Sequence, residues 1–151
     1  MYLMTQFDPT RAIEEVVRDI TVWLFVGFVV VPLLLIWLIV SGAKFGIAIN
    51  DYILVKNYSM DNDRYELAKG KPFSIEEGYY SEIMYTNGYS NFIIKASGSA
   101  ETPVYVLYKV KHPDKGIIYN EKYQRDEVIT RAAIMLVLAV LLIPCFGGLF
   151  L

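Results

Sequence analysis

Two long runs of apolar residues frame the chain, and no charged residue interrupts either of them. The first run extends from Ile20 to Ala43 and the second from Ala132 to Leu151. A helix that crosses the hydrocarbon core of a bilayer needs ~20 predominantly apolar residues. The pattern therefore predicts two transmembrane helices, over residues 20–43 and 132–151.

The first run has features that are typical of a retained membrane anchor. Trp23 and Trp37 lie near its two ends, where amphipathic rings favour the membrane interface. The run is longer than the apolar region of a signal peptide, and the residues before it include several acids. Pro32 lies in the middle of the run and lacks a backbone N–H, so it predicts a kink.

Residues 1–19 are expected to form an amphipathic helical tail. Asp8 is a favourable N-cap, and Pro9 is a favourable first helical residue. Apolar side chains then recur at helical spacing, whereas charged side chains occupy the other face. We interpret the tail as a solvated lead-in to the first span. The alternative is a face that docks on a partner subunit or rests on the membrane surface.

Residues 44–131, between the two apolar runs, are predicted to fold as a small domain. This insert contains eleven of the twelve tyrosines, and disordered segments are poor in aromatic residues. Apolar spacing predicts one helix near residues 48–58 and a second near 61–69. Gly70, with Pro72 beyond it, is the expected signal for the end of the second helix.

Strand patterns fill the second part of the insert. Asn87-Gly88 lies between two alternating segments and predicts a tight hairpin turn with positive φ at both residues. Phe92, Ile94 and Ala96 share one face of the strand that follows. Residues 113–116 predict a further turn. The expected strands cover residues 72–75, 79–85, 90–97, 103–111 and 117–123.

These elements predict a membrane protein in which two transmembrane helices flank a small α+β domain. Three or four antiparallel strands would form a sheet, with one or two helices packed on one face of it. Tyrosines crowd these strands, and tyrosine is enriched at protein interfaces. We expect cross-strand packing for part of them and partner binding for the set Tyr79, Tyr80, Tyr85, Tyr89, Tyr105 and Tyr108.

The charge balance and the rarity of Cys and His narrow the chemistry further. Hydrophobic residues make up 55% of the chain, and the net charge of −2 does not favour a nucleic-acid partner. One Cys and one His rule out a disulfide framework and a multi-histidine metal site. We interpret Cys145 as an apolar filler and His112 as a surface residue. We expect no catalytic residues, no metal and no cofactor.

An acidic stretch is the strongest remaining candidate for a site. It comprises Asp61, Asp63, Glu66, Glu76 and Glu77. Asp61 and Asp63 have the spacing that opens a calcium-binding EF-hand loop, but the glycine and the closing glutamate of that loop are missing. A solvated edge is therefore the favoured interpretation.

The order of the elements resembles a known domain. That order is a membrane span, a helix pair, a short glycine–proline step and an antiparallel sheet. Residues 66–72, 91–99 and 104–106 carry the similarity. They resemble the domain shared by cytochrome oxidase assembly factor one and inner-membrane translocase subunit twenty-one, over about half of the chain and through short motifs. The resemblance implies a binding and assembly module rather than an active site.

These observations favour a non-catalytic accessory subunit or assembly factor of a larger membrane complex, of respiratory-chain or translocase type. The spans and the tyrosine-rich insert would bind the other subunits. An alternative is a membrane-anchored domain that senses a small ligand or a lipid. A third, weaker possibility is a membrane enzyme that acts through the acidic stretch.

The expected location is the mitochondrial inner membrane or the bacterial cytoplasmic membrane, with both spans inserted. Two arguments on orientation disagree. Basic residues of the insert beside the spans, such as Lys44 and Arg131, favour an insert in the matrix or cytoplasm. The family resemblance places the insert in the intermembrane space or periplasm, and we adopt this outer orientation.

Overall fold

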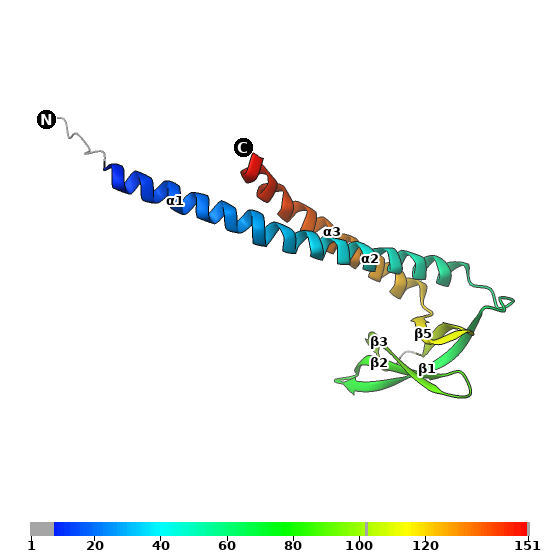
Figure 1. The fold of residues 1–151 in the computed structure, drawn as a ribbon. Helices are drawn as coiled ribbons and strands as arrows, with labels where there is room; N and C mark the ends of the chain where they lie inside the picture. Colours follow the sequence, from blue (N-terminus) through cyan, green and yellow to red (C-terminus); the bar gives the residue numbers. More distant parts are fainter. Residues whose placement is uncertain (1–7, 102, 151) are drawn as a thin grey trace. The chain divides into compact units, whose positions relative to one another are not determined.

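The computed structural model describes residues 8–101 and 103–150. Within this part of the chain, two long apolar helical segments flank a five-stranded antiparallel sheet in the sequence (Figure 1). The chain divides into two compact units. Among the described residues, one unit contains 8–43 together with 132–150, and the other is Lys44–Arg131.

The first helical segment runs from Pro9 to Asn57 through three consecutive elements. These are α1 (Pro9–Phe25), the π-helical turn η1 (Val26–Val30) and α2 (Val31–Asn57). Asp8 caps α1, since its carboxylate accepts a hydrogen bond of 3.0 Å from the backbone N–H of Thr10. The N-cap expected at Asp8 is thus confirmed.

Pro32 is accommodated by a wide helical turn. A proline ring clashes with the carbonyl group four residues earlier, which here belongs to Phe28. Phe28 lies inside η1, and the N–H of Val31 bonds to the carbonyl of Val26, five residues back. A π-turn of this kind absorbs the misfit while the helix continues. The disturbance predicted from Pro32 therefore takes the form of a π-turn.

The second helical segment, α3 (Glu121–Phe150), contains the described part of the second apolar run. It begins where the sequence predicted the end of a strand over residues 117–123. Asn120 caps it, because its side-chain oxygen accepts a hydrogen bond of 3.0 Å from the N–H of Tyr123. The predicted strand is therefore wrong beyond Ile118. The helix also begins before the predicted span, because residues 121–131, which include charged side chains, belong to α3.

The sheet has the strand order β3-β2-β1-β4-β5, and every neighbouring pair is antiparallel. The central strand β1 serves both halves of the sheet. Its residues 65–70 pair with β4, and its residues 71–76 pair with β2. The strands are β1 (Tyr65–Glu76), β2 (Tyr79–Thr86), β3 (Asn91–Ser99), β4 (Val104–Lys109) and β5 (His112–Ile118).

The helix predicted over residues 61–69 is wrong. Residues 59–64 form turns, and from Tyr65 onward the chain is a strand. The segment from Glu66 to Lys69 has good helix formers, but strand pairing with β4 overrides this local preference. By contrast, the helix predicted near 48–58 is confirmed as the last part of α2.

The sheet curls around its own core. Ile83 and Val106 are completely buried, and β3 contacts β5 although the two strands are not neighbours in the sheet order. Gly70 lies at the point where β1 passes from one partner strand to the other. A Cβ atom there would be 2.5 Å from a methyl carbon of Ile83, so only glycine fits without displacing the core. The core cluster comprises Tyr80, Ile83, Tyr85, Ala96, Val104, Val106, Tyr108 and Ile118.

Helical residues cover parts of this domain. On the sheet face opposite the core, Leu107 is buried and lines a cavity together with Ile47 and Leu54 of α2. In the first turn of α3, the Gln124 side chain donates a 2.8 Å hydrogen bond to the carbonyl of Ile118, and Tyr123 packs against the core. The helix-plus-sheet layout is thus confirmed, but the sheet has five strands instead of three or four, and helical residues lie against both of its faces instead of one.

The tight turn with two positive φ angles lies in a different hairpin from the one predicted. The two-residue turn with positive φ at both positions is at Glu77 (52°) and Gly78 (81°), between β1 and β2. Asn87 has no positive φ, and only Gly88 does (90°), within a four-residue loop. The side-chain oxygen of Asn87 closes this loop by accepting the N–H groups of Tyr89 and Ser90.

Residues 113–116 do not reverse the chain. The reversal between β4 and β5 occurs at Val110-Lys111, where Lys109 pairs with His112. The next pair joins Tyr108 to Gly116, so residues 113–115 bulge out of the ladder. The proline and glycine that predicted a turn therefore mark an irregular strand.

Candidate functional site

Three of the six tyrosines expected to bind a partner lie in the core of the domain. Tyr80, Tyr85 and Tyr108 are each less than 8% exposed. The Tyr85 ring centre is 5.7 Å from that of Phe92 and 5.8 Å from that of Tyr108. Aromatic pairs at such distances stabilise a core. These tyrosines leave almost no surface for a partner, and their crowding reflects packing across strands.

Two of the core phenols donate hydrogen bonds. The Tyr85 hydroxyl donates to the backbone carbonyl of Pro113, in the bulge of β5. The Tyr108 hydroxyl donates to a carboxylate oxygen of Glu66 over 2.6 Å. Burial, together with this carboxylate, raises the pKa of Tyr108 to about 12. The phenol is therefore a neutral hydrogen-bond donor at physiological pH.

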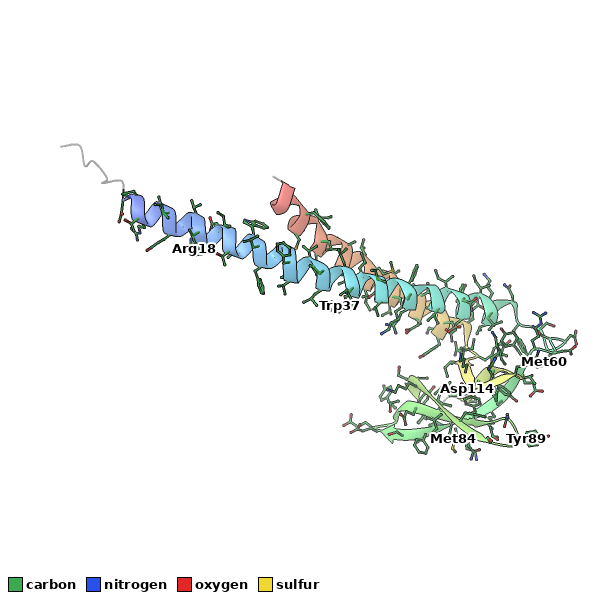
Figure 2. All side chains as sticks on the ribbon, in the orientation of Figure 1. Arg18, Trp37, Met60, Met84, Tyr89 and Asp114 are labelled. Carbon is green, nitrogen blue, oxygen red and sulfur yellow. The ribbon has the colours of Figure 1, made fainter. Side chains whose placement is uncertain are left out.

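The other three predicted tyrosines lie at the surface but do not form one cluster. Tyr89 is 96% exposed in the loop between β2 and β3 (Figure 2). Tyr79 is 67% exposed and begins β2, directly after the Glu77-Gly78 turn. Tyr105 is about half exposed, and it pairs with Lys69 in the other half of the sheet.

Two more exposed apolar residues lie close to Tyr79 in the sequence of the β1–β2 hairpin. Phe73 and Ile75, in the last part of β1, are both more than half exposed. We call Phe73, Ile75 and Tyr79 the hairpin patch. Ile75 pairs with Tyr80 and Glu76 pairs with Tyr79, so the side chains of Ile75 and Tyr79 lie on opposite faces of the hairpin. Residues 71–76 of β1 pair with β2 on one side only, since β4 pairs with the earlier half of the strand. The hairpin patch thus combines large apolar side chains with an open strand edge.

A small tyrosine-lined cleft lies elsewhere on the domain. Tyr80, Tyr105, Tyr119 and Tyr123 line it together with serine residues of β3, and its volume is about 180 Å³. Gly98 opens the space for the Tyr80 ring, because a Cβ at this position would be 2.6 Å from the Tyr80 hydroxyl oxygen. The sequence interpretation missed Tyr119 and Tyr123 as cleft residues because it placed both in a strand.

A second depression is basic. Arg64, Lys109, Lys111 and His112 line it, with Asp63 and Tyr65, between the start of β1 and the turn after β4. We call these six residues the basic pocket. The sequence interpretation missed it because it placed Arg64 in a helix, away from residues 109–112. The spacing Lys-Val-Lys-His was the available signal.

The acidic stretch does not assemble into a site. Asp61 and Asp63 lie in the turns before β1, whereas Glu76 and Glu77 lie at the opposite end of that strand, and Glu66 is bonded to Tyr108. In the residues that the structure describes, no group of three or more His, Cys, Asp or Glu side chains is placed to hold a metal ion. Cys145, in α3, donates to the carbonyl of Leu141 at 3.4 Å.

Comparisons with protein-family models, with curated proteins and with solved structures gave no match.

Proposed function

We propose that this protein is a membrane-anchored, non-catalytic accessory subunit or assembly factor of a larger membrane complex. The apolar helices hold the chain in the bilayer, and the Lys44–Arg131 unit binds a partner protein. The observation that carries the proposal is the hairpin patch, which combines three exposed large apolar side chains with the unpaired edge of residues 71–76 of β1.

The composition and exposure of the helices support the anchoring role. Both helical segments are long and apolar enough to cross a membrane. Phe28 is 79% exposed and Ile39 is 71% exposed, and Ile143 of α3 is similarly open. A helix that is apolar all round is stable in a protein core or in lipid rather than in water. Lipid is the environment we assign to residues 20–43 and 132–151.

The hairpin patch has the chemistry of an interface centre. Full burial of a side chain of this size stabilises an association by ~1.5–3 kcal/mol relative to exposure. Aromatic residues are enriched at the centres of interfaces. The open edge of β1 adds backbone groups to which an extended segment of a partner can bond. We therefore propose a partner that presents an apolar strand to this edge.

The respiratory-chain or translocase version of this role rests on the family resemblance alone. The family has a helix end at the position of residues 66–72, whereas these residues lie in β1. The first matching segment thus lacks the element on which the resemblance depends. We propose a partner of stated chemistry in a membrane complex, rather than a particular complex.

The outer orientation of the insert rests on the family resemblance alone and is directly testable. Tyr89→Cys in a Cys145→Ala background places a single thiol at the most exposed tyrosine of the domain. We expect an impermeant thiol reagent, applied from the intermembrane-space or periplasmic side, to label this cysteine in sealed membranes. Labelling only after permeabilisation would place the insert on the matrix or cytoplasmic side.

A native pull-down with protein identification tests the binding role. The test variant combines Phe73→Thr, Ile75→Thr and Tyr79→Thr, which removes the apolar surface and keeps residues that favour strands. Ile93→Thr is the matched control, because Ile93 is an exposed apolar residue of β3 outside the hairpin patch.

We expect the wild-type chain and the control to retain a heteromeric partner. The triple variant should remain in the membrane with a protease-resistant domain but lose that partner. A chain that purifies without any other protein would contradict the proposal. A triple variant that keeps its partner would assign the binding to another part of the molecule.

A further inference from the structure

The basic pocket is a second candidate site, separate from the hairpin patch. It lies at the beginning of β1, whereas Ile75 and Tyr79 lie at the other end of the β1–β2 hairpin. Its volume is about 460 Å³. This value falls within the range of ~300–1,000 Å³ that is typical of small-molecule sites. The pocket is therefore large enough for a ligand and independent of the proposed partner interface.

Positive charge dominates the pocket. Three basic side chains, those of Arg64, Lys109 and Lys111, line the pocket together with one acidic side chain, that of Asp63. The ion pairs within the described residues join Arg18 to Asp19, Arg125 to Asp126 and Arg131 to Glu127, and none of them includes a pocket cation. Placing several like charges close together costs electrostatic free energy. A bound anion would offset this cost.

The strands hold the cations in place. Lys109 pairs with Tyr65 across the β1–β4 ladder, and its ammonium nitrogen is 5.8 Å from the centre of the Tyr65 ring. The carbonyl of Arg64 accepts a 3.1 Å hydrogen bond from the N–H of Val110. The N–H of Arg64 donates to the side chain of Asn62 at 3.0 Å. These bonds fix the backbone beneath the charged side chains, so the cluster is partly pre-organised.

We propose that the basic pocket binds a phosphate group. An arginine fork contacts two oxygens of a phosphate at once, whereas lysine ammonium groups act as point charges on the others. The imidazole of His112 adds a further ring nitrogen beside them. A phosphate carries enough negative charge to engage several cations, and its source is either a soluble phosphate compound or a lipid headgroup.

Two probes applied to the full chain distinguish these sources. The first is inorganic phosphate, titrated by calorimetry against the protein in phosphatidylcholine nanodiscs. The second is phosphatidic acid, whose retention relative to phosphatidylcholine is read by native mass spectrometry of the detergent-purified protein. The test variant is Arg64→Gln with Lys109→Gln. The matched control, Lys71→Gln with Lys95→Gln, removes the same charge from exposed strand residues outside the pocket.

We expect the pocket variant to weaken binding by about tenfold or more, because it removes two charge-assisted contacts to the phosphate. The control should change binding less than about twofold. Binding of inorganic phosphate assigns the site to a soluble compound, and retention of phosphatidic acid alone assigns it to a lipid headgroup. Both results support the proposal.

Two results would overturn the proposal. One is that neither probe binds, and the other is that the two variants lose binding equally, which would indicate general charge attraction. Lys111→Gln separates loss of binding from loss of folding, because Lys111 lies in the exposed turn after β4. This variant should keep the thermal unfolding of the wild type and still weaken binding several-fold.

Discussion

Large apolar side chains are exposed along the apolar helices but buried in the core of the sheet domain. In the sheet, Ile83 and Val106 have no exposed surface, and the buried phenols of Tyr85 and Tyr108 donate hydrogen bonds. In the helical segments, Phe28 and Ile39 keep most of their surface open. The sheet contains its own apolar environment, whereas the helices require one from outside.

The cause of this difference is the period of the apolar pattern. Strand β3 alternates, so Phe92, Ile94 and Ala96 turn inward while the residues between them face away. Residues 20–43 have no polar face, so no rotation of that helix hides its apolar surface. Alternation produces a core within the chain, and a continuous run leaves apolar side chains exposed all round the helix.

The largest effect is expected from a cavity in the sheet core. Ile83→Ala removes a fully buried side chain, and such changes cost ~2–5 kcal/mol of unfolding free energy. We expect the domain to become sensitive to protease while the chain stays in the membrane fraction. Ile93→Ala, at an exposed position of β3, should change stability by less than about 0.5 kcal/mol. Equal protease sensitivity of the two variants would contradict the assigned core.

An arginine introduced into the apolar helix, and one introduced into the sheet, test whether the two exposed surfaces differ in environment. Ile36 and Ile93 are both about half exposed, but we assign Ile36 to lipid and Ile93 to water. Ile36→Arg should weaken insertion by ~2.5–3.5 kcal/mol if it lies near the bilayer centre, whereas Ile93→Arg should leave insertion unchanged. An insertion assay measures both. Indistinguishable insertion of the two variants would mean that the two exposed surfaces face the same solvent.

A smaller effect is expected where β1 changes partners. The Cβ of Gly70→Ala would lie 2.5 Å from Ile83, and overpacking of this kind costs ~1–3 kcal/mol. Gly46→Ala is the control, because no atom lies within 4 Å of a Cβ at that helical position. Denaturant unfolding should destabilise the first variant only. A Gly70→Ala domain as stable as the wild type would show that the strand has room to move.

The smallest effect concerns alkaline pH. Because the pKa of Tyr108 is raised to about 12 in the folded domain, its phenol ionises more readily in the unfolded chain, near pH 10. The neutral phenol of Tyr108 therefore stabilises the folded domain fully below about pH 10, and this contribution to the free energy of unfolding is lost as the pH rises toward 12. Burial also raises the pKa of Tyr80 and Tyr85, which act in the same direction.

Tyr108→Phe tests this contribution. The variant loses the bond to Glu66, which costs ~1 kcal/mol at neutral pH, and its stability should fall less steeply between pH 10 and 12. Chemical unfolding across this range provides the measurement. An unchanged slope would indicate that Tyr108 does not contribute to the alkaline transition.

Elements with a continuous or strictly alternating pattern could be predicted from the sequence. The two apolar helices and the inward face of β3 belong to this group. The hairpin between β2 and β3 was also located, although Asn87 closes it with its side chain instead of adopting a positive φ. Glu77-Gly78 forms the tighter turn, and glutamate is not a residue that signals one.

Elements that depend on distant partners could not be predicted. The segment from Glu66 to Lys69 has helical propensity, and only its pairing with β4 makes it a strand. The same pairing brings Arg64 beside Lys109, so the basic pocket exists only in the folded domain. Among the tyrosines, Tyr79 and Tyr80 are adjacent in sequence yet lie at the surface and in the core. A bulge in the β2–β3 ladder after Tyr80 further obscures the alternation.

Tryptophan fluorescence in lipid vesicles tests the central claim most directly. The chain has two tryptophans, Trp23 and Trp37, and both lie in the first apolar run. The measurement compares their emission in phosphatidylcholine vesicles with and without bromine atoms on the acyl chains, close to the headgroups. We expect strong quenching by the brominated lipid and blue-shifted emission, because both rings contact the acyl chains. Unquenched, red-shifted emission from the intact chain would place the apolar helix outside the bilayer and contradict the account.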